Sequence, residues 1–170
     1  MKLDLHVHLQ EATNVAIPDA KLVRKLIDVV KSRGLDGIAV TEHSDTSYGY
    51  RIKEIVDREF HGEIIVIPGQ ERPCGPHHIV ELHLPCGCIF RFVAHPGRLL
   101  PPYPEALDGI QGVEVQNGSW VVDEESVRRF AEERGLILLC NSDAHTLTDI
   151  GRHYNVIDLS TLCTAAHGSS

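Results

Sequence analysis

The sequence predicts one α/β domain, spanning residues 1–170 and built as a compact or incomplete barrel. Short apolar runs alternate with segments of helical periodicity, which indicates strands joined by helices. Ionisable side chains follow several of these runs, as they do at the active rim of barrel enzymes. A complete eightfold barrel usually needs roughly 200 residues or more. A smaller barrel therefore fits this chain better, and a doubly wound sheet is the alternative.

The first elements follow from their periodicity. Residues 2–7 alternate between apolar and polar side chains, which predicts a strand. Its apolar face holds Leu3, Leu5 and Val7, and its polar face holds Asp4, His6 and His8. Residues 19–33 show helical spacing and are followed by Gly34, which suits a helix end. Residues 37–41 are expected to form a short buried strand, and residues 51–60 a second amphipathic helix.

The middle of the chain predicts three strands. Residues 63–68 are apolar and β-branched, as in many buried strands. Residues 78–84 and 88–94 are expected to be two more strands, joined as a hairpin across residues 85–87.

The last part of the chain repeats the strand–helix pattern. Residues 112–116, 136–140 and 155–159 are the expected strands. A helix is predicted over residues 123–134, because Asp123 is a good N-cap and Gly135 follows its end. About ten residues at the C-terminus are expected to form a tail.

Composition excludes several classes of protein. The net charge is −8, from 16 basic and 24 acidic residues, which argues against bulk nucleic-acid binding. No apolar run is long enough for a membrane span, and the first residues do not resemble a signal peptide. Five cysteines, an odd number, suggest free thiols in the cytoplasm. Cys86 and Cys88 are interpreted with Cys74 as turn and small core residues, because their spacing is too short for a usual zinc motif.

Histidine and acidic side chains recur where predicted strands end. If the strands are parallel, these ends meet at one rim. Imidazole and carboxylate groups together suit zinc, manganese or iron. Each residue alone is more often structural, but the whole set predicts two or three divalent ions. The set comprises His6, His8, Glu42, His43, Glu71, His95, Asp143 and His145.

Five short motifs, taken in order, resemble those of the PHP family, the polymerase and histidinol phosphatase domains. The motifs are Asp4–His8, Thr41–Asp45, Pro68–Glu71, Ala94–Pro96 and Asn141–His145. The resemblance extends from residue 2 to about residue 151. It implies a distorted, TIM-like (β/α)₇ barrel with a trinuclear metal site and phosphoesterase activity.

Carried over by position, the resemblance implies three sets of metal ligands. The first is His6, His8 and Asp143, and Glu71 bridges to the second, which adds His95 and His78. His77 and His83 are rivals for the place of His78. The third set is His43 and His145. The catalytic residues are expected to be His6, His8, Glu71, Asp143 and His145.

One departure from the family pattern concerns the third metal. Many relatives carry an aspartate or histidine soon after the first motif, whereas residues 9–14 contain neither. Glu11 is the candidate substitute, and the protein is expected to work with two or three ions.

The implied reaction is hydrolysis of a phosphomonoester or phosphodiester by a hydroxide that bridges two metals. Arg72, Arg98 and Arg152 follow the motifs and are candidate clamps for the phosphate of a small substrate. Trp120 is a candidate pocket residue, and Glu114 lies near the site in sequence. The short chain leaves little room for a lid, so the pocket is expected to be open or to be completed by a second subunit.

Two other functions compete with this interpretation. Amidohydrolase-like deaminases and amidases also begin with two histidines on the first barrel strand, but they often use a bridging lysine that has no counterpart here. A non-catalytic metal-binding or regulatory module is the other alternative.

Overall fold

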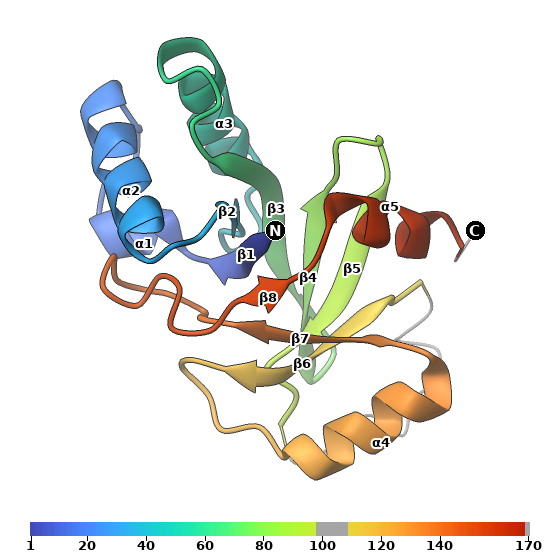
Figure 1. Ribbon diagram of the computed structural model, residues 1–170. Coiled ribbons are helices and arrows are strands. Elements are labelled where there is room, and N and C mark those ends of the chain that lie inside the picture. Colours follow the sequence, from blue (N-terminus) through green and yellow to red (C-terminus); the bar gives the residue numbers. More distant parts are fainter. Residues whose placement is uncertain (98–108, 169–170) are drawn as a thin grey trace.

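The computed structural model describes residues 1–97 and 109–168, and its strands form one curved sheet (Figure 1). The strand order is β7-β6-β5-β4-β3-β2-β1-β8. The strands are β1 (Lys2–Val7), β2 (Gly37–Val40), β3 (Ile65–Cys74), β4 (His77–His83), β5 (Ile89–Ala94), β6 (Gly112–Asn117), β7 (Ile137–Asn141) and β8 (Asn155–Val156). The helices in the described residues are α1 (Leu9–Thr13), α2 (Ala20–Ser32), α3 (Ser47–Glu59), α4 (Glu124–Arg134) and α5 (Leu159–His167).

The sheet curves until its last strands return to the first, which makes a nearly closed barrel. Beyond the end of β7, Ala144 bridges Val7, and its carbonyl accepts a hydrogen bond from His8 N at 2.9 Å. The side chain of Asn155 in β8 bonds the backbone of Cys140 in β7 and of Leu3 in β1. The predicted α/β barrel is therefore confirmed, with side-chain bonds closing the gap between β7 and β1.

A single rim was predicted on the assumption that all strands are parallel. This assumption is wrong for β4 and β8. β4 runs antiparallel to both β3 and β5, and β8 runs antiparallel to β1. The predicted hairpin between β4 and β5 is confirmed. The reversal of β4 puts its first residues, rather than its last, beside the C-terminal ends of β3 and β5. His78 therefore reaches the same rim from an N-terminal end, whereas His83 lies at the far end.

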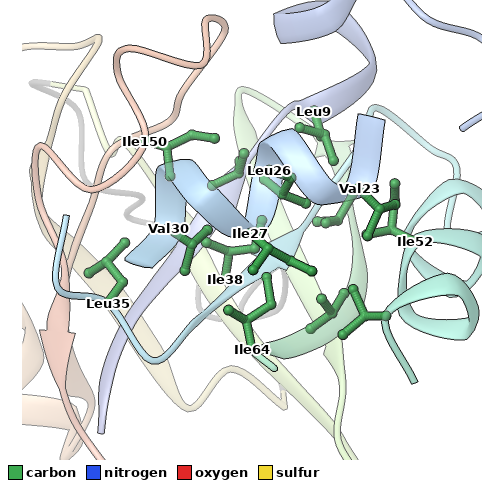
Figure 2. Close-up of a cluster of buried hydrophobic side chains, with 14 of the residues drawn as sticks. Leu9, Val23, Leu26, Ile27, Val30, Leu35, Ile38, Ile52, Ile64 and Ile150 are labelled. Carbon is green, nitrogen blue, oxygen red and sulfur yellow. The ribbon is translucent and has the colours of Figure 1, made fainter. Parts of the chain in front are cut away.

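Two large apolar clusters lie on opposite faces of the sheet. The inner cluster draws on β1 to β5, β7 and α5, and includes Phe90, Phe92 and Leu162. The outer cluster lies where α2 and α3 cover the sheet. Figure 2 shows Leu26 and Ile27 of α2 packed toward Ile38 of β2.

The simple alternation predicted for β1 is wrong. Leu3 and Leu5 pack in the inner cluster, whereas Val7 packs in the outer one. The pairing of β1 with β2 shifts register between Asp4 and Val7, as at a β-bulge. A bulge redirects the following side chains. In this way the strand keeps its leucines in the core and still turns His6 toward the rim.

The predicted helices are present, with differences at their ends. Asp19 caps α2 by accepting a hydrogen bond from Leu22 N at 2.8 Å, and Asp123 caps α4 in the same way. α3 begins at Ser47, four residues before the predicted start. The predicted C-terminal tail is wrong, because α5 forms there. Within the described residues, no helix combines the length and apolar character needed to cross a membrane.

Candidate metal centre

The barrel brings together at one rim the eight side chains that the family resemblance implies as metal ligands. Seven of them, with Glu11, form three overlapping groups of donor atoms. The first group joins His6, His8 and Glu71, the second Glu71, His78 and His95, and the third His8, Glu11, His43 and His145. Asp143 lies against the first group.

The first group has the spacing of a tetrahedral metal site. Nε2 of His6 and Nε2 of His8 are 3.1 Å apart. Oδ1 of Asp143 lies 3.5 Å from the first nitrogen and 3.2 Å from the second. The Glu71 carboxylate lies 3.7 and 3.5 Å from the same two atoms. Ligands held at roughly 2.0–2.1 Å around a tetrahedral zinc ion stand about 3.3–3.4 Å apart. The four side chains, His6, His8, Glu71 and Asp143, can therefore surround one ion.

The second group shares a carboxylate with the first. Oε1 of Glu71 lies 2.9 Å from Nδ1 of His78 and 2.9 Å from Nε2 of His95. Of the rivals to His78, His77 belongs to none of the three groups. His83 instead bonds the Tyr50 hydroxyl at 2.9 Å. The structure therefore selects His78 among the three candidates.

The third group is built around Glu11, the residue left uncertain by the sequence. Its carboxylate lies 3.5 Å from Nε2 of His43 and 3.6 Å from Nε2 of His145. Both imidazole rings stack on His8, with centroids 4.3 and 4.4 Å away. Helix α1 begins directly after β1, and this puts Glu11 over the rim. Glu11 thus occupies the place where the family pattern expects an aspartate or histidine.

Two buried polar atoms at the rim support a fit to metal ions. Oδ2 of Asp143 and Nδ1 of His8 are buried and have no hydrogen-bond partner. A buried carboxylate oxygen without a partner is costly, and coordination to a cation would remove that cost. Imidazole and carboxylate donors also match the preferences of zinc, manganese and iron. The residues present therefore fit divalent ions.

Two of the candidate ligands have backbone conformations that L-residues rarely adopt. His95 has φ +28° and Asp143 has φ +50°, and neither is a glycine. Such strain concentrates at functional sites, where the surrounding structure holds it in place. His95 follows β5 directly and Asp143 comes two residues after β7, so a strained turn at each strand end redirects the side chain into the rim.

Sequence reasoning underestimated Glu114, which lies in β6 beneath the rim. Its side chain is fully buried and accepts a hydrogen bond from Nδ1 of His6 at 2.9 Å. It also accepts bonds from the side-chain amides of Asn117 and Asn141 and from His95 N. A glutamate between two valines of a predicted strand was the available signal.

Two other buried carboxylates fix the backbone around the ligands. Asp4 accepts hydrogen bonds from Ser142 and from Gly151 N, and burial raises its pKa to about 6. Glu42 accepts a bond from Gln10 N at 2.8 Å at the start of α1, and burial raises its pKa to about 7. Glu42 therefore positions the helix that carries Glu11.

The electrostatics of the rim favour ionised carboxylates. Burial raises the pKa of Asp143, but the hydrogen bond from His8 and the nearby charge of His6 outweigh it and hold the pKa at about 2. Burial likewise raises the pKa of Glu71, and bonds from His6 and His95 bring it well below the usual range. Ionised carboxylates are the form that binds cations.

Two of the predicted phosphate-binding arginines, Arg72 and Arg152, pair with other carboxylates instead of the ligands. Arg72 points to Glu81 on β4, with Nε 3.1 Å from its carboxylate. Arg152 pairs with Asp149 at 2.9 Å on the surface. Arg98 lies outside the described residues. Trp120, in contrast, stacks on His95 with ring centroids 5.4 Å apart and is 61% exposed.

Comparisons with known proteins agree with this fold. Residues 124–166, which include Asp143 and His145, match the PHP-associated family model. A solved structure from Bifidobacterium adolescentis, of a proposed metal-dependent phosphoesterase, aligns with TM-score 0.70 and 14% identity over 95% of each chain. The predicted resemblance to the PHP family is confirmed.

Two further solved structures share the PHP-like barrel. An amidohydrolase from Chromobacterium violaceum aligns over 97% of each chain with TM-score 0.66 and 17% identity. PsfC from Pseudomonas syringae aligns over 88% of this chain and 78% of its own, with TM-score 0.63 and 18% identity. A comparison with curated proteins gives no significant match. At these sequence identities the likeness shows the barrel fold alone. Whether the chain hydrolyses phosphate esters or amides has to be inferred from the residues at the rim.

Proposed function

We propose that the protein is a metal-dependent phosphoesterase that acts on a small phosphomonoester or phosphodiester at the barrel rim. The observation that carries the proposal is the position of Glu71 between two sets of imidazoles. Its carboxylate lies within 3.7 Å of His6 and within 2.9 Å of His95. A carboxylate shared in this way suits two ions about 3.5–4 Å apart, the arrangement used by many phosphatases and nucleases.

The chain's own residues hold and orient these ligands. Because a carboxylate only accepts hydrogen bonds, Glu114 keeps the proton of His6 on Nδ1 and leaves Nε2 free to bind. The carbonyl of Asp143 has the same effect on His145, whose Nδ1 it bonds at 2.9 Å. Two or three divalent ions held here, Zn²⁺, Mn²⁺ or Fe²⁺, would activate water and neutralise charge on the phosphate.

The pocket beside the third group supports a role for metal ions in binding an anion. Its described lining is acidic or neutral, with no lysine or arginine among the residues that the structure places there. The lining residues are Gln10, Glu11, Asn14, Glu42, His43 and Asp45. Without bound cations this surface would repel a phosphate, so substrate binding should depend on the metals.

The phosphoesterase and amidohydrolase interpretations differ at the bridging position. A carboxylate, Glu71, stands between the first two groups, whereas Lys53 pairs with Asp57 at 2.7 Å within α3. This supports phosphate-ester hydrolysis over amide hydrolysis. The odd number of cysteines, five, suits a reducing compartment, which supports a proposed location in the cytoplasm.

The test is a substrate screen with metal-free protein reloaded separately with zinc, manganese or iron. Phosphomonoesters, phosphodiesters and amides are assayed side by side, and Asp143→Asn is the inactive control. Phosphate-ester turnover that Asp143→Asn abolishes is the expected result. Turnover of amides alone would favour the amidohydrolase alternative. Full metal loading with no turnover, together with a stable macromolecular partner, would favour a regulatory module.

A further inference from the structure

Three aromatic rings lie in stacked contact between the first metal group and the surface. The imidazoles of His6 and His95 stack with centroids 6.0 Å apart and an angle of 21° between their planes. The indole of Trp120 stacks on His95 in turn, at 5.4 Å and 28°. His6 is fully buried, whereas Trp120 is exposed. The series therefore begins among the candidate ligands and ends at a ring that solvent can reach.

Hydrogen bonds fix residues 117–120, which we call the tryptophan loop, against the ligands. The side-chain oxygen of Asn117 accepts bonds from Ser119 N at 2.8 Å and from Trp120 N at 2.9 Å. The Ser119 hydroxyl donates to the carbonyl of Asp143 at 2.9 Å. The tryptophan is thus held in place beside His95 before any ligand binds.

The tryptophan loop also lies so close to the end of β7 that one of its positions has no room for a side chain. A Cβ added to Gly118 would lie 2.3 Å from Ser142 O. The side-chain amide of Asn117 donates to Glu114, the buried carboxylate beneath the rim, at 2.8 Å. The loop and the candidate metal ligands therefore form one connected structure, and a group bound on Trp120 has a defined position relative to the rim.

Trp120 takes part in none of the three apolar clusters of the described chain. Its large ring therefore gains little from packing in the free protein, and a second flat ring stacked on it would bury part of its apolar surface. Because the tryptophan loop is already ordered, little conformational freedom is lost on binding. Aromatic side chains presented in this way stack on nucleobases in many nucleic-acid-binding proteins.

A cationic group is a second kind of ligand that a tryptophan can bind. Quaternary ammonium groups are typically recognised by cages of several aromatic rings. Among the described residues, the ring contact of Trp120 is with His95 alone. A single flat platform of this kind fits a flat ring better than a rounded cation.

We propose that the tryptophan loop is a subsite for a flat aromatic ring, and that the substrates are phosphate esters that carry such a ring. Nucleoside monophosphates belong to this class. The inference rests on the proposed function, in which metal ions at the rim hold the phosphate. Phosphate and ring would contact neighbouring parts of one rim, because Trp120 stacks directly on a candidate ligand. Esters without a ring would lose this second contact.

The test measures binding, so that it does not depend on turnover. The probes are the phosphonate analogues of adenosine monophosphate and of the corresponding ribose phosphate, in which a CH₂ group replaces the ester oxygen and prevents hydrolysis. The two probes differ only in the ring. Zinc-loaded wild type should bind the adenosine analogue about 10-fold more tightly by calorimetry, within the range of base–aromatic stacking.

Fluorescence locates the bound ring. The chain has one tryptophan, so its emission reports on Trp120 alone. The adenosine analogue should quench this emission and the ribose analogue should not. Adenosine itself, which has no phosphate, should also quench it, at higher concentration.

Three variants separate stacking from other effects. Trp120→Ala should bind the two analogues equally, and Trp120→Phe should keep most of the difference. Tyr154→Ala removes an exposed aromatic ring that lies by Lys2, and it should behave like wild type. The zinc content of each variant shows that the rim is intact.

The ring subsite is overturned if wild type binds both analogues equally, or if neither they nor adenosine quench Trp120. It is also overturned if Trp120→Ala weakens both analogues to the same extent, because the indole would then support His95 rather than a ligand. A larger gain from Trp120 for the phosphonate analogue of choline phosphate would assign the loop to a cation instead. Failure of the proposed function looks different, since no ester is then hydrolysed while quenching by adenosine persists.

Discussion

Nδ1 of His6 lies 2.9 Å from a carboxylate oxygen of Glu114, and both side chains are fully buried. The same oxygen accepts a bond from the Asn141 amide at 2.8 Å, so the carboxylate cannot rotate away freely. The contact sets which nitrogen of His6 faces the other ligands. Glu114 is therefore a positioning residue, which acts on a metal through His6.

Replacing this carboxylate should weaken metal binding without removing a ligand. Glu114→Gln keeps the shape of the side chain but replaces one of its two acceptor oxygens by an NH₂ group. Both oxygens now accept bonds, so one side of this network loses its acceptor and the hold on His6 is weakened. We expect a loss of roughly 10- to 100-fold in affinity for the first metal. Metal titration by calorimetry measures it, with Glu132→Gln on the exposed face of α4 as the matched control. An unchanged affinity would contradict the positioning role.

Glu11 should decide how many ions the rim holds. Its carboxylate faces His43 and His145 and belongs only to the third group. Glu11→Gln should lower the metal content of a fully loaded chain while the first two groups stay filled. Metal analysis after gel filtration measures the change, with Glu59→Gln as a surface control. If the metal content is the same in both variants, Glu11 is not a ligand.

The rim could be predicted from the sequence because each ligand follows a recognisable strand. Parallel strands bring their ends together whatever their order, so Glu71 and Asp143 could be assigned to one site before the fold was known. His78 lies at the rim only because β4 runs antiparallel to its neighbours. The structure, and not the sequence, therefore distinguished it from His77 and His83. Glu114 could not be assigned, because no local pattern links it to His6, 108 residues earlier.

The C-terminal helix was missed for a related reason. Residues of α5 are mostly small or polar, and a nine-residue helix is marginal in isolation. Its stability comes from burial of Leu162 and Ala166 under the barrel, a tertiary contact with no sequence signature. The bulge in β1 could not be predicted either, because alternation alone gives no sign that Leu5 and Val7 face opposite clusters.

Trp120 should contribute to substrate binding rather than to chemistry. Its ring stacks on His95, a candidate ligand, and is 61% exposed, so it can meet a substrate bound at the rim. For a phosphate ester that carries a flat aromatic group, Trp120→Ala should raise KM by about 10-fold, within the range of stacking energies, and leave kcat unchanged. Trp120→Phe should restore most of the binding. An equal effect on glycerol phosphate, which has no ring, would show that stacking is not the cause.

Acid should weaken the ion pairs that join α2 to Glu63, in the loop before β3. Arg24, and then Lys31, lower the pKa of Glu63 from 4.5 to about 2. A depressed pKa means that the carboxylate stabilises the fold above pH 4.5 and loses this effect as the pH falls toward 2. The effect should be small and salt-sensitive because the three side chains are partly exposed. Thermal melting of metal-free wild type and Glu63→Gln should therefore differ at pH 7 and converge in acid, and a constant difference would contradict the ion pair.

The closure of the barrel should depend on Asn155. Its side-chain oxygen accepts from Cys140 N at 2.9 Å, and its amide donates to the carbonyls of Cys140 and Leu3. Asn155→Ala would leave the buried carbonyl of Leu3 without this partner, at a cost of roughly 1–3 kcal/mol. The two backbone groups of Cys140 are only partly buried and can turn to water, so we expect a total loss of about 2–4 kcal/mol. Val156→Ala, at a side chain that is 79% exposed, should cost less than about 0.5 kcal/mol. Urea unfolding of the two variants compares them directly, and similar midpoints would mean that β7 and β1 are held together without the Asn155 side chain.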